Sequence, residues 1–222
     1  HAAAVMCDSR FSANEFRALI DADAAIDVVY PGVDGRFAHI VRARDDVRPF
    51  ALVVGTVEAR KNLKVLIDAL PAIPRLRIVA VGPPTAYADE CRARAAELGV
   101  AGRVELRGYV GREELDGLYA QASCALVPSR YEGFGYALAE ALCAGLPVVA
   151  ARTSSLIEVA GDGVPLLDPD DASAWSTTVN AMLSDPEGTE AAARERRAGA
   201  IARFAWATAA ARVKGVYERV LG

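Results

Sequence analysis

The sequence has few of the residues that build metal centres, disulfide frameworks or histidine-based active sites. Among 222 residues the only histidines are His1 and His39, which leaves almost no material for a catalytic triad. The four cysteines are scattered and form no Cys-x-x-Cys pair: Cys7, Cys91, Cys124 and Cys143. Cys124 and Cys143 lie in apolar runs, as small core residues do. We therefore expect no metal site, no disulfides and a reducing, cytoplasmic setting.

Long apolar runs and basic tracts are also missing. No run approaches the roughly 18 apolar residues that a membrane span needs, and no signal peptide is visible. The net charge is -4, without the clustered lysines and arginines of a nucleic-acid-binding surface. Because 53% of the residues are hydrophobic, the chain can bury the core of a full domain. The first residue is not Met, so we expect the sequence to be a piece of a longer chain.

Short apolar runs alternate with longer helical patterns along most of the sequence. The expected strands are 50–54, 76–81, 104–106, 124–127, 147–150 and 164–167. The expected helices are 62–73, 87–98, 113–122, 135–144, 156–160 and everything beyond residue 171. This alternation predicts βαβ crossovers and an α/β domain with a doubly wound, Rossmann-like parallel sheet. Such sheets bind ligands beyond the carboxyl ends of their strands, so functional residues should come directly after strands.

Two adjacent cations follow the first expected strand. The segment from Gly55 to Asn62 contains Arg60 and Lys61 and leads into a helix. Arginine grips a phosphate with two parallel hydrogen bonds, lysine adds a point charge, and a helix N-terminus adds free N–H groups. A diphosphate site and a solvated basic turn are both compatible with this segment.

A glycine-rich loop with an acidic residue follows the fourth expected strand. Glu132, Gly133 and Gly135 lie in this loop, and Glu140 lies in the helix after it. The glycines permit close approach of the backbone. A carboxylate accepts two hydroxyl hydrogen bonds at once, which suits the vicinal diol of a ribose or hexose. Because the neighbours of Glu140 are apolar, we expect its charge to have a partner or a ligand.

Three further segments carry weaker signals. Gly108 to Val110, after the third strand, offers backbone groups to a nucleobase, although taken alone this segment fits a plain loop better. Ser154-Ser155 has the chemistry of a helix N-cap. Glu158 follows in the same short helix, where a structural role is at least as natural as a ligand role.

The two ends do not fit the α/β pattern. Residues 1–30 contain a strand near Ala4–Cys7 and a short helical piece. Pro31 to Asp34 has turn chemistry and reads as a linker. The last helix, about 205–221, carries an apolar stripe that suits either packing across a domain boundary or an edge helix on the same domain.

Taken in order and spacing, these motifs resemble the C-terminal half of retaining GT-B glycosyltransferases of family 4, the glycosyl transferases group 1 class. The resemblance rests on residues 55–62, on Glu132-Gly-Phe-Gly with Glu140 eight positions later, and on residues 144–149. Residues 30–34 resemble the inter-domain linker of that family, and 5–11 the last strand of its N-terminal domain. Residues 204–221 resemble its crossover helix. The resemblance implies that the chain has three parts: 1–30 from the acceptor domain and linker, 31–204 as donor domain, and 205–222 as crossover helix.

The resemblance also implies roles for matching positions. Glu132, Arg60 and Lys61 would be catalytic: the cations hold the donor diphosphate, and Glu132 binds the donor sugar. Glu140 would bind the ribose. Positions expected to contact the nucleotide-sugar are Gly55, Gly108, Val110, Gly133, Phe134, Gly135, Tyr136, Ala137, Leu138 and Glu140.

Enzymes of this class transfer sugar with retention and without a metal ion or further cofactor. The donor would be GDP-mannose or a UDP-sugar, with the mannose type favoured by residues 55–64, and the acceptor a glycan or a lipid-linked sugar. Because nearly all of the acceptor-binding domain is missing, we expect this chain to bind nucleotide but to transfer little or no sugar. Peripheral attachment to the inner membrane face would come from the missing half.

Three alternatives remain open at this stage. A dinucleotide oxidoreductase would need Gly-x-Gly-x-x-Gly after the first strand, where the sequence has only Gly55. A GT-B-type nucleotide-sugar epimerase fits the Arg-Lys pair and the two glutamates less well. A non-catalytic nucleotide-sugar-binding module would keep the fold without the activity.

Overall fold

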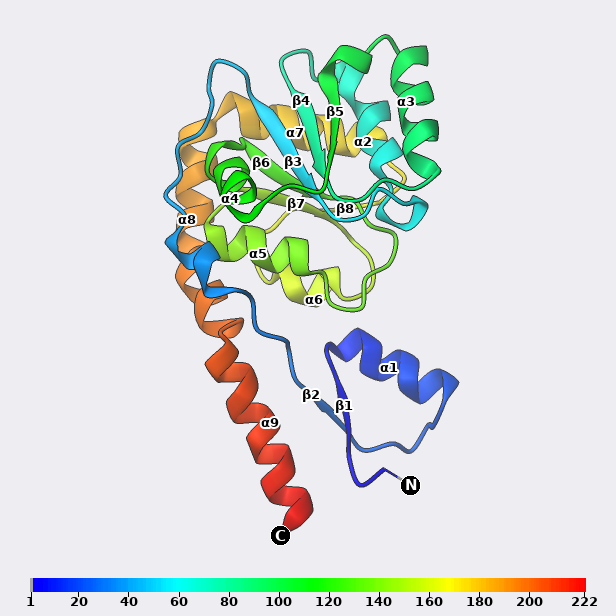
Figure 1. The fold of residues 1–222 in the computed structure, drawn as a ribbon, viewed down its shortest axis with the longest axis vertical. Coiled ribbons are helices and arrows are strands. Elements are labelled where there is room, and N and C mark those ends of the chain that lie inside the picture. Colours follow the sequence, from blue (N-terminus) through cyan, green and yellow to red (C-terminus); the bar gives the residue numbers. More distant parts are fainter. Residues whose placement is uncertain (1) are drawn as a thin grey trace.

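A six-stranded parallel sheet forms the centre of the computed structural model, which describes residues 2–222; His1 lies outside the described residues. Its strand order is β5-β4-β3-β6-β7-β8 (Figure 1). The strands are β3 (Phe50–Val54), β4 (Arg77–Val81), β5 (Val104–Gly108), β6 (Cys124–Val127), β7 (Val148–Ala151) and β8 (Leu166–Leu167). Every strand pair is parallel. The predicted doubly wound α/β sheet is confirmed.

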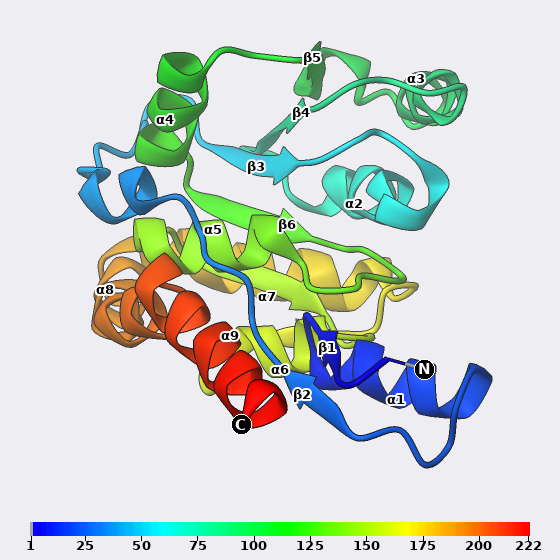
Figure 2. The same cartoon turned by 60° about the horizontal axis from the view of Figure 1, so that its bottom comes forward.

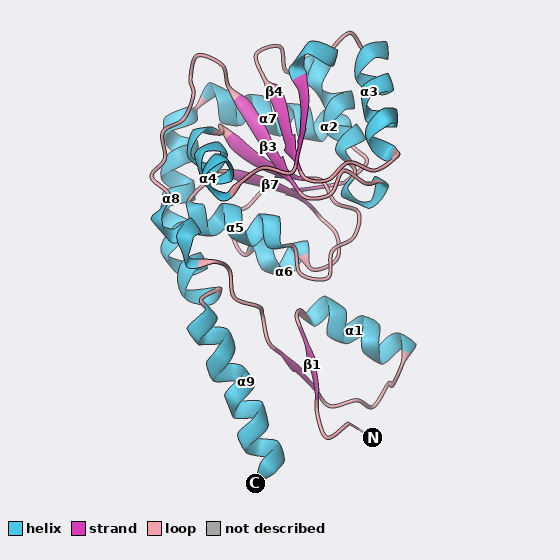
Figure 3. Cartoon of the chain, viewed as in Figure 1, coloured by secondary structure: helices cyan, strands magenta, loops and turns pink. Residues whose placement is uncertain are grey.

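Helices cover both faces of this sheet, which is why its central strands are continuous apolar runs. One face carries α2 (Leu63–Ala69), α3 (Tyr87–Glu97) and α7 (Ala172–Ser184), and the other α4 (Arg112–Gln121), α5 (Tyr136–Ala144) and α6 (Leu156–Ala160) (Figure 3). The helix expected over 62–73 is shorter than predicted. It ends at Ala69 in a 3-10 turn (Leu70–Ala72) that contains Pro71, because proline supplies no N–H to continue an α-helix.

The strand order reverses between β3 and β6. From β3 the chain moves outward to β4 and β5, and then returns through α4 to β6 on the other side of β3. The loops after β3 and β6 therefore leave the same edge of the sheet in opposite directions. Such a reversal opens a crevice at the carboxyl ends of the two strands. The carboxyl ends of β3 and β6 lie at the end of the sheet that faces α1 in Figure 1.

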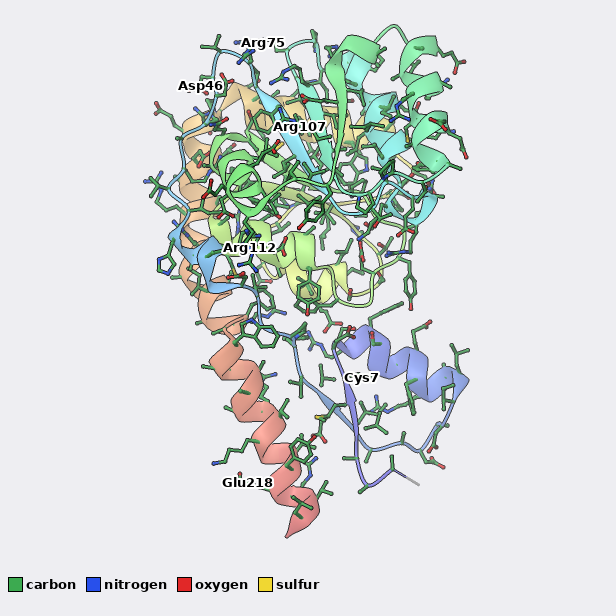
Figure 4. The ribbon with its side chains drawn as sticks, in the orientation of Figure 1. Cys7, Asp46, Arg75, Arg107, Arg112 and Glu218 are labelled. Atoms are coloured by element: carbon green, nitrogen blue, oxygen red, sulfur yellow. The ribbon has the colours of Figure 1, made fainter. Side chains whose placement is uncertain are left out.

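The N-terminal residues form a separate unit. The strands β1 (Val5–Cys7) and β2 (Ile26–Val28) pair in parallel around α1 (Arg10–Leu19) and do not join the main sheet. The strand β2 was not predicted, because it is only three residues long and Asp27 interrupts its apolar pattern. Cys7 of β1 lies in this unit, far from the main sheet (Figure 4). Cys124 and Cys143 are buried core residues, as predicted.

Residues 29–34, which connect this unit to the main domain, contain no turn, so the turn expected at Pro31–Asp34 does not form. Gly32 serves close packing instead: a Cβ added there would lie 2.3 Å from Cδ2 of Trp206. A 3-10 turn (Gly35–His39) follows and places the buried Phe37 in the core.

Beyond residue 171 the chain is helical, as predicted, and contains α8 (Pro186–Arg203) and α9 (Trp206–Leu221) after α7. Figures 1 and 2 show α9 running away from the six-stranded sheet and alongside β2. Arg219 of α9 forms an ion pair with Asp27 of β2. Trp206, Tyr217 and Leu221 are exposed on this helix. This course favours the domain-boundary interpretation of the apolar stripe over an edge helix. Within residues 2–222, no helix is both long enough and apolar enough to cross a bilayer.

Candidate functional site

The loops after β3 and β6 meet at the point where the strand order reverses. The backbone N–H of Arg130 donates to the Arg60 carbonyl at 2.9 Å and joins the two loops. Lys61 Nζ donates to Glu132 Oε1, and Arg60 Nη1 donates to Glu132 Oε2 at 3.0 Å. The structure thus brings together the three residues predicted to be catalytic.

Glu132 is a buried carboxylate held between two cations. Its exposed fraction is 7%. Burial is the largest single influence on its pKa and acts to raise it, but Lys61, Ser129 and Arg60 together hold the pKa below its ordinary value. Glu132 is therefore ionised at neutral pH. A carboxylate has about four acceptor positions, so the hydrogen bonds from Lys61 and Arg60 leave some of them for a ligand hydroxyl.

The loop after β3 owes its shape to Asn62. This residue adopts a left-handed conformation (φ 55°, ψ 38°), which asparagine tolerates better than most residues. Its buried side-chain amide donates to the carbonyls of Pro128, at 3.3 Å, and Pro169, at 2.7 Å. Asn62 thereby ends the 3-10 turn that carries Arg60 and Lys61 and attaches it to the β6 loop. The sequence interpretation assigned Asn62 no role, although an asparagine directly before a helix was the available signal.

Five consecutive backbone N–H groups, from Gly133 to Ala137, donate no hydrogen bond within residues 2–222. They lead into the N-terminus of α5, whose N-cap residue is Gly135. Gly135 has φ 92° and ψ 57°, and a Cβ there would lie 2.6 Å from Leu156 Cδ2, so only glycine fits. Free N–H groups at a helix start form a site for an anion. Five of the residues predicted to contact the nucleotide-sugar therefore have a free backbone N–H group: Gly133, Phe134, Gly135, Tyr136 and Ala137.

Leu138, which was also predicted to contact the nucleotide-sugar, has no free backbone N–H group. Its N–H donates to the Gly135 carbonyl at 3.1 Å, and its side chain is fully buried. The contact expected from its backbone is therefore already used inside α5.

Two serine hydroxyls bond the backbone of Glu132. Ser154 Oγ accepts from the Glu132 N–H at 2.9 Å, and Ser155 Oγ donates to the Glu132 carbonyl at 2.9 Å. Ser155 stands at the N-cap of α6 but makes no capping hydrogen bond. The predicted capping role of this serine pair is therefore wrong, because both hydroxyls position the Glu132 loop.

Glu140 lies one helical turn beyond Tyr136 on α5 and is partly exposed. The hydroxyl of the buried Tyr119, on α4, donates to Glu140 Oε2 at 2.9 Å. Burial is the main cause that raises the pKa of Glu140, and Tyr119, Arg36 and Lys61 act against it. The prediction that this charge has a partner is confirmed.

The remaining predicted contacts extend along the same edge of the sheet. Gly55 lies against Lys61: a Cβ there would be 3.3 Å from Lys61 Cε. Gly108 ends β5, two strands from β3, and its carbonyl accepts from the Gly82 N–H at 2.8 Å. Val110 follows it and is half-buried. The structure thus places Gly108 and Val110 at the far end of the edge that Arg60, Lys61 and Glu132 occupy.

Glu158 takes the structural role that the sequence analysis left open. Its carboxylate accepts from the N–H groups of Arg10 and Phe11, at 3.1 and 2.9 Å, and from the Tyr30 hydroxyl at 2.7 Å. It caps α1 from a different part of the chain and attaches the N-terminal unit to α6. The Ser12 hydroxyl adds a bond to the Gly133 carbonyl at 3.3 Å.

The comparisons with known proteins agree with the fold. The sequence model of the family described as glycosyl transferases group 1 matches residues 36–199. The chain belongs to this family.

Among its relatives is the O-antigen chain mannosyltransferase B of Escherichia coli, 34% identical over 174 residues (76% of this chain and 45% of the relative). A second is the GDP-mannose-dependent alpha-(1-6)-phosphatidylinositol monomannoside mannosyltransferase of Mycolicibacterium smegmatis. It is 31% identical over 229 residues, with 92% of this chain and 59% of the relative covered. The chain spans about half the length of the curated relatives it matches.

Solved structures show the same fold. Sucrose-phosphate synthase of Thermosynechococcus elongatus superposes with a TM-score of 0.88 at 23% identity, over 100% of this chain and 59% of that one. HepE of Anabaena, solved in complex with UDP and glucose, gives 0.86 at 24% identity, over 98% and 64%. The described chain is one half of a GT-B fold with its C-terminal helix.

Proposed function

We propose that this chain is the donor-binding half of a glycosyltransferase that moves a hexose from a nucleoside-diphosphate sugar to a glycan or lipid acceptor. The observation that carries the proposal is the row of unpaired N–H groups from Gly133 to Ala137 beside Arg60, Lys61 and Glu132. An anion bound there would receive both hydrogen bonds and positive charge. Family membership supports the assignment of that anion as a diphosphate.

Each part of this arrangement has one task. The N–H groups at the start of α5 and the two cations hold the diphosphate. Glu132 accepts hydrogen bonds from hydroxyls of the donor sugar, and Glu140 from hydroxyls of the ribose. Gly55, Gly108 and Val110 leave room for the base and phosphates along the sheet edge. The proposed parts of the chain are 1–30 from the acceptor domain and linker, 31–204 as donor domain, and 205–222 as crossover helix.

The chemistry needs no group beyond the substrates and these side chains. The bond between the anomeric carbon and the leaving phosphate oxygen breaks, and the acceptor hydroxyl oxygen forms the new bond on the same face. The acceptor proton passes to the leaving phosphate, so configuration is retained without a metal ion. Arg60 and Lys61 stabilise the charge that develops on the diphosphate, which is the step where fixed cations contribute most.

The donor is proposed to be GDP-mannose, with a UDP-sugar as the second candidate. Two relatives carry mannosyltransferase names, and one of these names GDP-mannose. HepE, which has the same fold, was solved with UDP, and this supports a UDP-sugar as the second candidate.

Since the chain spans about half the length of its curated relatives, the acceptor side is proposed to lie in a further domain of the whole protein. The exposed apolar side chains of α9 would pack against that domain, and the peripheral contact that we propose for this cytoplasmic enzyme with the inner membrane would come from it. We expect the chain alone to bind nucleotide and to transfer little or no sugar. Sugar transfer by the chain alone, measured with GDP-mannose and a mannoside acceptor, would contradict that expectation.

Thermal unfolding with GDP, UDP, ADP and CMP tests the proposal. A nucleotide at 100 times its dissociation constant stabilises the folded state by about 2.7 kcal/mol, which is readily detected. Stabilisation by GDP alone supports a mannose-type donor, and by UDP alone a glucose-type donor. No stabilisation by any of the four contradicts a preformed donor site in this chain.

A further inference from the structure

We infer that Tyr119 is the positioning residue that holds Glu140 in place for the ribose of the donor nucleotide. The inference rests on the proposed function and adds a residue to its site. The Tyr119 hydroxyl donates to Glu140 Oε2 at 2.9 Å, and the two side chains come from neighbouring helices, α4 and α5.

Tyr119 is itself held firmly. Only 1% of it is exposed, and its ring meets the Phe37 ring edge to face at a centroid distance of 4.9 Å. Phe37 is equally buried and belongs to the 3-10 turn after the linker. A phenol whose ring is locked by packing points its hydroxyl in one direction, so it can fix the rotamer of the carboxylate it bonds.

The bond leaves half of the Glu140 carboxylate available. Oε1 of Glu140 accepts no hydrogen bond within residues 2–222, and the side chain is partly exposed. Glu140 follows Tyr136 by four positions, so the two share a face of α5. Side chains of a helix lean toward its N-terminus, and here that end carries the unpaired N–H groups. A ribose attached to a diphosphate at that end therefore lies within reach of Oε1.

The charged surroundings of Glu140 fit this role. Besides Tyr119, the groups that act on the carboxylate are Arg36 and Asp34 from the linker side and Lys61 from the β3 loop. None of these makes a hydrogen bond or ion pair with Glu140, so Tyr119 is its one direct partner within residues 2–222. Loss of the phenol hydroxyl would leave the carboxylate free to rotate.

The test is the preference for ribose over 2′,3′-dideoxyribose, measured by calorimetry as the ratio of dissociation constants for GDP and dideoxy-GDP, and for UDP and dideoxy-UDP. We expect the unmodified chain to prefer the ribose form of its nucleotide by about tenfold or more, the size of one hydrogen bond to a charged group. Tyr119→Phe keeps the ring packing and removes the hydroxyl. It should bring the ratio close to one and leave dideoxynucleotide binding unchanged.

Two further variants separate positioning from general damage. Tyr87→Phe removes another buried phenol hydroxyl, one that accepts from the Lys64 N–H, and should keep the full ribose preference. Glu140→Gln should lose the preference, and Tyr119→Phe added to it should have no further effect.

Each outcome decides between the claims. An unchanged ribose preference in Tyr119→Phe overturns the inference, as does equal weakening for both sugars. The absence of ribose preference in the unmodified chain overturns the role of Glu140. The absence of nucleotide binding overturns the proposed function itself.

Discussion

The carboxylate of Glu132 lies between Lys61 and Arg60 and accepts a hydrogen bond from each, so the carboxylate and the two cations hold one another in place. Glu132 is the most buried of the three, and its two serine contacts fix the loop that carries it. A diphosphate would have to share these cations with Glu132. The carboxylate and the ligand phosphates therefore compete for the same positive charge.

That competition predicts that replacing Glu132 affects the binding of the sugar nucleotide and of the free nucleotide differently. Glu132→Ala removes a sugar-binding carboxylate and frees both cations. Binding of the nucleoside-diphosphate sugar should weaken by about ten- to a hundredfold, while binding of GDP or UDP alone should be unchanged within about threefold or improve. Calorimetry with the sugar nucleotide and the nucleotide measures both. A parallel loss for the two ligands would argue against a role of Glu132 at the sugar.

Replacement of Lys61 should act on the nucleotide itself. In Lys61→Met the diphosphate loses a charge-assisted hydrogen bond, so GDP or UDP should bind about ten- to a hundredfold more weakly. Lys214→Met is the matched control, because Lys214 lies on the distal α9 and pairs only with Glu218 within the described chain. Fluorescence or calorimetric titration gives both values. Equal affinities in the two variants would exclude Lys61 from the diphosphate site.

The lowered pKa of Glu132 makes a prediction about stability and pH. Between the folded-state pKa and the ordinary value of 4.5, the unfolded chain binds the proton more strongly, so stability rises with pH in that window. The contribution is complete above 4.5 and disappears as the pH falls through the folded-state value. Urea unfolding should therefore show that the advantage over Glu132→Gln shrinks below pH 4.5. In a Lys61→Met background the same difference should depend less on pH, and a pH-independent difference in the unmodified background would contradict the pairing.

Gly135 should tolerate no side chain. Alanine would have to adopt φ 92° and would meet Leu156, so Gly135→Ala should destabilise the fold by about 1–3 kcal/mol and distort the N–H groups before α5. Nucleotide affinity should fall at least tenfold in the fraction that remains folded. Gly102→Ala is the control, since a Cβ there meets nothing within 4 Å. Full nucleotide affinity in Gly135→Ala would show that this turn does not shape the site.

Glu158 should decide how firmly the N-terminal unit is attached. Its carboxylate accepts the N–H groups of Arg10 and Phe11, so Glu158→Ala should speed hydrogen exchange at these two amides. Mass spectrometry of the peptides covering α1 detects the change. The exposed Glu97→Ala serves as a comparison, because Glu97 contacts only Arg94 within residues 2–222. Unaltered exchange at the start of α1 would mean that other contacts hold the unit.

The sequence alone predicted the parts of the fold that follow from local pattern. Apolar runs, several of them ended by a glycine or a proline, located the strands of the main sheet, and the candidate carboxylates Glu132 and Glu140 lie in the loop after β6 and on α5. The strand β2 was missed because three half-exposed residues carry no periodic signal. The serine pair was misread as a cap, since the carbonyl that Ser155 bonds belongs to a loop 23 positions earlier in the chain.

The same limit applies to partners that only tertiary structure brings together. Tyr119 lies in an ordinary helical pattern, and its hydroxyl meets Glu140 from a different helix, 21 positions away. Glu158 reaches Phe11 across 147 positions. From the sequence alone, Tyr119 cannot be distinguished from an ordinary buried tyrosine, nor Glu158 from an ordinary surface glutamate.

Hydrogen exchange at the amides of Gly133 to Ala137, measured with and without saturating GDP or UDP, tests the proposed donor site most directly. These N–H groups have no acceptor within the described chain, so a diphosphate that binds as proposed should slow their exchange strongly, along with that of the Arg60–Asn62 segment. Nucleotide binding that slows exchange elsewhere and leaves Gly133 to Ala137 unchanged would contradict the assignment of this loop as the diphosphate site.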